Sequence, residues 1–184
     1  LFRCHRDYDG ALKELAIARP GLPNDAAFFI LSGYINRRRN NLAQAERDFF
    51  TAVALDPRNP NAYNLLADTY NLQRKHLLAA QVYDRVLAAG ERTPIVFYRR
   101  DSALFNRSGD STELRRVLLE NPDLDVGGGQ TPYRVFLALI DGNFAEAERI
   151  LAASPREEFQ DIDYSFYYPK VWFEAMIARA KGDS

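Results

Sequence analysis

The sequence has 184 residues, of which 47% are apolar and 27% are charged, and its formal net charge is −1. This is the composition of an ordinary folded protein, and a charge this close to zero excludes a global attraction to nucleic acid or to an anionic membrane. The single cysteine excludes an internal disulfide bond, and no apolar run reaches the ~18 residues that a membrane-spanning helix needs.

The first expected elements are one half-repeat and one complete helical hairpin. Apolar residues at helical spacing predict a helix that closes a half-repeat at residues 7–23, where prolines end it. A complete hairpin repeat follows at residues 24–57, with Asn24 or Asp25 as the cap of its first helix, helix A. Its second helix, helix B, is expected to run to Leu55.

A second complete hairpin is predicted at residues 60–90, and it reproduces the first at a period of 34 residues. The aligned pairs are Phe29 and Tyr63, Gly33 and Ala67, Ala45 and Ala79, and Phe49 and Tyr83. A fixed period of this length is typical of one supersecondary unit that is copied along a chain, each copy burying its apolar face against the next. The period therefore predicts an all-α solenoid.

These residues resemble the tetratricopeptide repeat (TPR) family. In that family, helix A carries an aromatic residue, a leucine, a small residue and a tyrosine, and helix B carries an alanine and an aromatic residue. The second hairpin has this pattern nearly complete, in Tyr63, Leu66, Ala67, Tyr70, Ala79 and Tyr83. The resemblance implies a right-handed superhelical solenoid of antiparallel helix hairpins. We expect Gly33 to face Ala45, and Ala67 to face Ala79, so that helices A and B approach closely.

Beyond Pro94 the copies become degenerate, although the period persists. Further repeats are predicted at residues 94–121 and 131–154. Glu113 stands where the family has alanine, so we expect its side chain to turn outward or its helix pair to splay. After residue 154 the register slips, and an acidic loop is predicted before a final helix at residues 169–181.

The resemblance covers almost the whole chain. It implies a single repeat domain over residues 1–184, with about five hairpins and both end repeats truncated. Arrays that are regular first and degenerate later look like those attached to bacterial regulatory proteins. The chain is therefore expected to be part of a larger regulatory or scaffold protein.

Motifs for catalysis or metal binding are weak throughout the sequence. The triplet His5-Arg6-Asp7 matches a kinase catalytic loop, but the asparagine required five residues after the aspartate is replaced by Leu12. Gly127 to Gly129 lack the lysine and serine or threonine of a phosphate-binding loop. His5 and His76 stand far apart without further ligands at metal-binding spacing. We therefore expect no enzyme activity, no metal and no cofactor.

Three clusters each leave two interpretations open. Arg37 to Arg39 are either a solvated turn at a helix C-terminus or an anion-binding patch. The acidic loop is either solvated or docks a basic partner; its members are Glu157, Glu158, Asp161 and Asp163. An aromatic cluster is either the packing of the last helix or an exposed association patch; its members are Tyr164, Phe166, Tyr167, Tyr168, Trp172 and Phe173.

The candidate binding site is a polar stripe on the A helices. In a hairpin stack of this kind, positions i, i+3, i+7 and i+10 of helix A point into the concave groove. In the second complete hairpin these positions are Asn61, Asn64, Asp68 and Asn71. Asparagine is a poor helix former, and its amide both donates and accepts hydrogen bonds, as a peptide backbone requires. The neighbouring A helices add Tyr34, Arg37, Tyr98, Arg99 and Ser102. A hydrated helix face is the alternative interpretation.

The carboxylate clamp that some family members use for chaperone C-termini is not expected. Its positions correspond to Ile30, Tyr34, Leu65, Ile95 and Arg99, of which only the arginine matches. The predicted function is a non-enzymatic interaction module that binds a peptide or protein segment in the concave groove. The alternative is a structural spacer or a homo-oligomer that associates through the aromatic cluster. No nucleic-acid or membrane partner is expected.

The lone cysteine and the lack of a signal peptide favour a cytoplasmic location. The chain does not begin with methionine, so a leader peptide removed from its start remains an open alternative.

Overall fold

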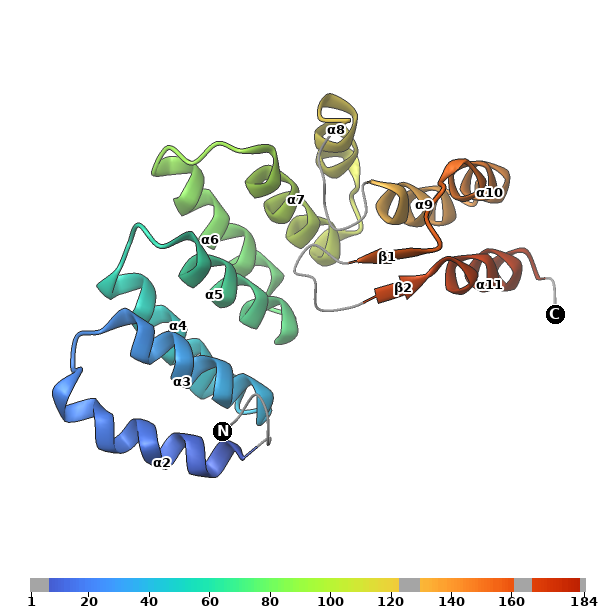
Figure 1. Ribbon diagram of the computed structural model, residues 1–184. Helices are drawn as coiled ribbons and strands as arrows, with labels where there is room; N and C mark the ends of the chain where they lie inside the picture. Colours follow the sequence, from blue (N-terminus) through green and yellow to red (C-terminus); the bar gives the residue numbers. More distant parts are fainter. Residues whose placement is uncertain (1–6, 123–129, 161–166, 183–184) are drawn as a thin grey trace. The chain divides into compact units, whose positions relative to one another are not determined.

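Helices form most of the structure, a computed structural model that describes residues 7–122, 130–160 and 167–182 (Figure 1). The chain divides into two units, Leu1–Asp110 and Ser111–Ser184. The boundary falls inside the predicted repeat at residues 94–121, between its two helices. The single repeat domain predicted for residues 1–184 stays a prediction.

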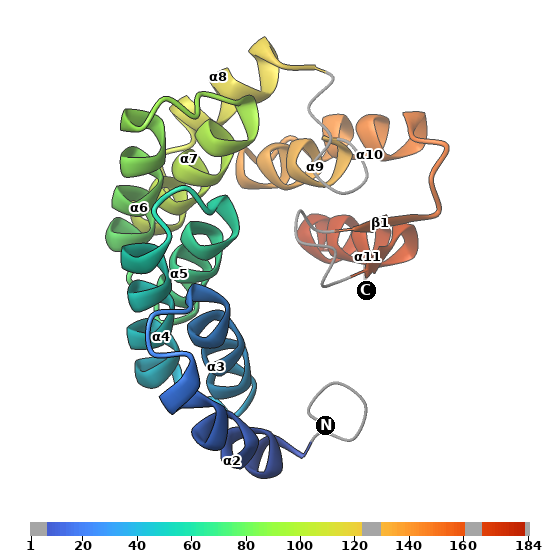
Figure 2. The ribbon, with the colours of Figure 1, turned by 60° about the vertical axis from the view of Figure 1, so that its left-hand side comes forward.

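The first unit is a stack of helices in which each helix packs on the next one along the chain. Its helices are α2 (Tyr8–Ala18), α3 (Ala26–Arg38), α4 (Leu42–Leu55), α5 (Pro60–Leu72), α6 (His76–Ala88) and α7 (Pro94–Ser108), with a short 3₁₀ turn at Arg19–Gly21. Figure 2 shows α3, α5 and α7 along the inner side of this curved unit and α4 and α6 along the outer side. The A helices of the predicted repeats therefore share one face.

Side-chain caps and prolines explain where several helices begin. A free backbone N–H group at a helix start needs an acceptor, and Asp or Asn at the preceding position provides one. Asp25 Oδ1 accepts from the Ala27 N–H at 2.7 Å, which confirms one of the two predicted caps. Asn41 and Asn59 cap α4 and α5 in the same way. Pro60 and Pro94 stand in the first turns of α5 and α7, where the missing N–H costs nothing.

The turn from helix A to helix B has one geometry that recurs along the chain. Asn40 and Arg74, one period apart, have positive φ angles of 62° and 59°. In each turn the next residue donates its N–H to a carbonyl five residues back, from Asn41 to Asn36 and from Lys75 to Tyr70, both at 2.8 Å. These bonds satisfy carbonyl groups at the helix end and fix the angle of the hairpin.

Small residues let the A and B helices of the first unit approach closely, as expected. Ala45, Ala67 and Ala79 are fully buried. The nearest side chain to Gly33 is that of Phe49: a Cβ atom added to Gly33 would lie 2.5 Å from Phe49 Cε1. Phe49 is itself fully buried, one helical turn after Ala45. The close contact of α3 with α4 therefore depends on a glycine opposite an aromatic ring.

We expect Ala79→Leu to lower the free energy of unfolding by about 1–3 kcal/mol, because the larger side chain overpacks a closed helix contact. Ala79 is 0% exposed. Urea denaturation followed by circular dichroism measures the loss. Ala88→Leu is the matched control, since Ala88 is exposed near the end of the same helix and its replacement should change stability by less than about 0.5 kcal/mol. Equal effects of the two substitutions would show that the assigned helix register is wrong.

A polar link joins α4 to the turn between α5 and α6. Glu46 Oε2 accepts from Lys75 Nζ at 2.7 Å and from Gln73 Nε2 at 3.0 Å. Partial burial opposes ionisation of Glu46, but these two hydrogen bonds outweigh it and hold the pKa of the carboxyl group below its ordinary value. The link adds a repeat-to-repeat contact outside the apolar core.

The second unit contains helices and a small sheet. The helices are α8 (Thr112–Glu120), α9 (Thr131–Ile140), α10 (Phe144–Ala153) and α11 (Lys170–Lys181), and the strands are β1 (Glu158–Gln160) and β2 (Tyr167–Pro169). The two strands pair antiparallel, with Phe159 opposite Tyr168. The buried core lies between α9, α10, α11 and the sheet and contains Val135, Ala138, Ala147, Leu151, Phe159, Phe173 and Ile177.

The hairpin corrects the prediction of an acidic loop before the final helix. Glu158 lies in β1, and the carbonyl of Glu157 accepts from the Lys170 N–H at 2.8 Å. The physical reason is Phe159, which is 1% exposed and anchors this strand in the core. Asp161 and Asp163 lie outside the described residues.

The side chain of Glu113 on α8 turns outward, which was one of the two expectations for this position, and it pairs with Arg116 at 2.8 Å.

Candidate functional site

The candidate face begins on α3, where Tyr34 and Arg37 lie together. Both are half-buried. The Arg37 guanidinium carbon lies 5.3 Å from the centre of the Tyr34 ring and 5.7 Å from the centre of the Phe49 ring, within cation–π distance of both. Among the described residues, no carboxylate lies within ion-pair distance of Arg37. The rings thus hold a cation whose charge is free to meet a ligand.

The α5 stripe supplies the neighbouring polar groups. Asn61 is exposed, and Asn64, Asp68 and Asn71 are half-buried. Asn71 Oδ1 lies 3.1 Å from His76 Nδ1, which places His76 in a local contact. The Asn64 amide makes no hydrogen bond within the described part of the chain. Asn64 is therefore a half-buried donor and acceptor that hydrogen bonding within the described residues does not use.

The predicted residues of α7 are less accessible than those of α3 and α5. Tyr98 is 4% exposed, and Arg99 and Ser102 are half-buried. The Ser102 hydroxyl is buried and has no hydrogen-bond partner among the residues described. Tyr34, Arg37 and Asn64 thus each keep part of their surface accessible, whereas Tyr98 belongs to the interior.

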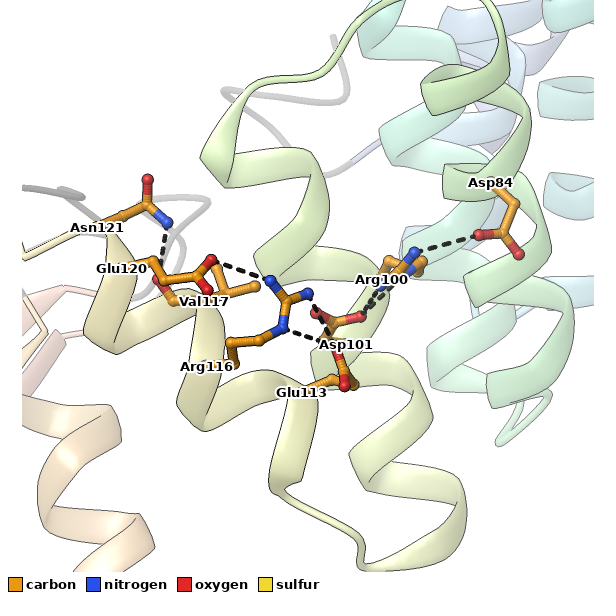
Figure 3. Close-up of polar contacts among 8 residues, drawn as sticks. All are labelled: Asp84, Arg100, Asp101, Glu113, Arg116, Val117, Glu120 and Asn121. Atoms are coloured by element: carbon orange, nitrogen blue, oxygen red, sulfur yellow. Dashed lines mark hydrogen bonds and ion pairs between the residues drawn. The ribbon is translucent and has the colours of Figure 1, made fainter.

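A buried charge pair on α7 was missed by the sequence reading. Asp101 is 1% exposed, and its Oδ1 accepts from Arg100 Nη2 at 2.7 Å (Figure 3). Arg100 also reaches Asp84 on α6 at 3.8 Å and lies over the ring of Phe97. This pair joins two helices of the first unit, and adjacent opposite charges in a sequence give no signal of such burial. In the second unit, Figure 3 shows the exposed Arg116 bonded to two glutamates of its own helix.

Two pockets lie away from the predicted stripe. One, of about 310 Å³, is enclosed by α8, α9 and α10; Leu118, Leu137 and Ile150 line it, and the Arg115–Asp141 ion pair, at 2.7 Å, stands at its rim. The other, of about 340 Å³, lies between α2, α3 and α4. Neither pocket was predicted from the sequence.

The aromatic cluster contributes to the core of the second unit. Phe173 is fully buried against Phe136, Phe159 and Tyr168. Trp172, next to it, is 41% exposed. The packing interpretation is therefore confirmed for Phe173, while Tyr164 and Phe166 lie outside the described residues.

The described residues contain neither a metal-binding group of side chains nor a membrane-spanning helix. Over residues 7–122, 130–160 and 167–182, no group of three or more His, Cys, Asp or Glu side chains is arranged to hold a metal ion. Within these ranges, no helix is both long and apolar enough to span a bilayer.

Comparison with known proteins identifies the fold. No family model and no curated protein matches the sequence. The crystal structure of YrrB, described as a TPR protein with an unusual peptide-binding site, superposes with a TM-score of 0.51 and covers 92% of this chain and 84% of its own. The chain has the tetratricopeptide repeat fold. The predicted TPR resemblance and all-α fold class are thereby confirmed, and at 18% sequence identity the likeness concerns the TPR fold alone.

Proposed function

We propose that this chain is a non-enzymatic protein-interaction module that binds a peptide or protein segment on the inner face formed by α3 and α5. The observation that carries the proposal is Arg37, a cation held over two aromatic rings with no carboxylate within ion-pair distance among the described residues. We place the unused amide of Asn64 on the same face. The TPR fold supports it at a coarser level, since YrrB is described as having a peptide-binding site.

The groups on this face suit an extended segment that carries an acidic residue. The Asn64 amide can donate to and accept from a peptide backbone, and its half-buried position makes such bonds stronger than in open water. Arg37 is already oriented by Tyr34 and Phe49, so less side-chain freedom is lost when a ligand carboxylate binds. Asp68, Asn71, Arg99 and Ser102 extend the proposed site along α5 and α7. A single site of this kind binds with Kd near 1 μM, about −8 kcal/mol.

The test is selection of peptides from a random library on the unaltered chain, followed by affinity measurement with fluorescently labelled peptides. The double substitution Asn64→Ala and Arg37→Ala should weaken binding at least tenfold, because it removes a charge-assisted contact and a backbone contact together. The matched control replaces Gln81 and Arg85, which are exposed on α6, by alanine and should leave Kd unchanged.

Two results would contradict the proposal. In the first, the selected peptides bind the doubly substituted chain as tightly as the original chain. In the second, the control substitutions on α6 weaken peptide binding as much as the double substitution does. Light scattering on the same samples measures the mass of the particle. A dimer that dissociates on Trp172→Ala would favour the alternative function, self-association through the aromatic cluster, for which the exposure of Trp172 is the supporting observation.

A further inference from the structure

Equivalent positions of the repeats can be compared with one another. The repeat formed by α3 and α4 differs from the next one at three of these positions. Asp48 on α4 occupies the position that holds Val82 one period later, Arg116 two periods later and Ile150 three periods later. Val82 is 4% exposed and packs in the core of the first unit. On α3, likewise, Ser32 and Asn36 stand where the next repeat has Leu66 and Tyr70. Three positions that hold Leu66, Tyr70 and Val82 in the second regular hairpin are thus all strongly polar in the first.

The three polar residues form one buried cluster around a carboxylate. Asp48 is 6% exposed; its Oδ2 accepts from Ser32 Oγ at 2.8 Å and from Asn36 Nδ2 at 3.1 Å, and its Oδ1 accepts from Gln44 Nε2 at 2.8 Å. All three donors are neutral. In the part of the chain that the structure describes, no cation lies within ion-pair distance of Asp48. Burial of a carboxylate without a counter-charge is costly, so a cation brought by a ligand would gain a strong partner here.

Asp48 lines a pocket whose other walls suit an aliphatic chain. This α2–α4 pocket, of about 340 Å³, has Asp48 and Ser32 in its lining together with apolar side chains from α2 and α3, which are Leu12, Leu15, Phe28 and Phe29. The rings of Phe28 and Phe29 meet edge to face, with centroids 5.2 Å apart. Apolar walls leading to a carboxylate match the methylene stem and ammonium head of lysine, and the aromatic rings add cation–π attraction.

The other charged side chains that line the pocket are two arginines, and they determine which residues of a ligand can lie next to its lysine. Arg19 from α2 and Arg47 from α4 line the pocket and are both exposed. Arg47 donates to Gln44 Oε1, and Gln44 Nε2 donates to Asp48 Oδ1, so one side chain, that of Gln44, links the guanidinium to the carboxylate. Two cations here repel a ligand that carries positive charge alone. They favour a segment in which acidic residues flank the lysine.

We propose that the α2–α4 pocket binds a lysine side chain of a partner protein, with its ammonium group on Asp48 and with neighbouring acidic residues of the partner on Arg19 and Arg47. The contact is independent of the inner face of α3 and α5, and it gives the module a second point of recognition. If the cluster served only to join α3 to α4, the pocket would have no preference for a charged ligand. A measured preference for lysine therefore distinguishes a binding role from a purely structural one.

The experiment titrates the full chain, labelled with ¹⁵N, with the blocked pentapeptide AEKEA and with the same peptide carrying norleucine in place of lysine. Norleucine keeps the aliphatic stem and removes the charge. The backbone amide signals of Leu15, Phe29 and Asp48 should shift with the lysine peptide, and its Kd should be at least tenfold lower than that of the norleucine peptide. Equal affinities, or no shift of these signals at millimolar peptide, would overturn the proposal.

Asp48→Asn tests the carboxylate directly and should abolish the preference for lysine, while Asp84→Asn, on helix B of the next repeat, should preserve it. If the Asp48→Asn variant does not fold, the affinities of the lysine and norleucine peptides for the unaltered chain still test the proposal. Butylammonium is the third probe: binding as tight as that of the pentapeptide would indicate a site for free amines and would overturn the assignment to a partner's lysine.

Discussion

Phe173→Ala is expected to lower the free energy of unfolding of the second unit by about 3–5 kcal/mol, the usual cost of removing a buried phenylalanine ring. Phe173 is 0% exposed, and four aromatic rings contact it edge-on, with centroid distances of 5.0 Å to Trp172, 5.4 Å to Phe136, 5.5 Å to Phe159 and 6.1 Å to Tyr168. The substitution leaves a cavity at the point where the helices and the small sheet meet. A loss of this size is a large part of the stability of a small unit.

The chain contains its own probe for this measurement. Trp172 is the only tryptophan in the sequence, and its ring lies 5.0 Å from that of Phe173. Its fluorescence during urea denaturation therefore reports the second unit. Val171→Ala is the control, because Val171 is 65% exposed on the same helix and should change stability by less than about 0.5 kcal/mol. A fluorescence midpoint that is the same in both variants would contradict the prediction.

Phe49→Ala should destabilise the first unit by a similar amount, about 3–5 kcal/mol. Phe49 is fully buried, its ring is nearly perpendicular to that of Tyr34 at 5.9 Å, and it occupies the space that a Cβ atom on Gly33 would need. Its removal also takes away one of the two rings beneath Arg37. We therefore expect weaker peptide binding in addition to lower stability.

The adjacent residue provides a close control for Phe49. Phe50 has the same side chain on the same helix but is 53% exposed. Phe50→Ala should leave both the unfolding midpoint and the peptide Kd nearly unchanged. Circular dichroism and the binding assay measure the two quantities. If both substitutions cost the same, the burial assigned to Phe49 and its contact with α3 are wrong.

The helices could be predicted from the sequence because their signals are local. Apolar periodicity, a capping residue such as Asp25 and a proline in the first turn lie within a few residues of the boundary that they set. The final helix, predicted at residues 169–181, is observed at Lys170–Lys181. The 34-residue period then supplied the pairing of helices, since copies of one hairpin must pack in one way.

The features that could not be predicted from the sequence depend on contacts between residues that are distant along the chain. Strand β1 has three residues, too few for an alternating pattern, and it forms because Phe159 reaches a core made by three helices. Helical spacing placed Asn64 and Tyr98 alike on the inner face, but packing leaves the first half-buried and the second 4% exposed. The polar character of Asp48 is visible in the sequence as its difference from Val82 at the same position of the next repeat, but its burial depends on contacts with α3.

Packing between consecutive helices also bears on how the protein forms. In the first unit, the principal contacts of each described helix are with the helices just before and just after it, so the residues in contact are close along the chain. Chains with such short-range contacts fold quickly, since little loop entropy is lost before contacts form, and a stack of repeats can nucleate at any hairpin. The hairpin of α3 and α4 can therefore acquire its native packing on the ribosome while α6 and α7 are still being synthesised.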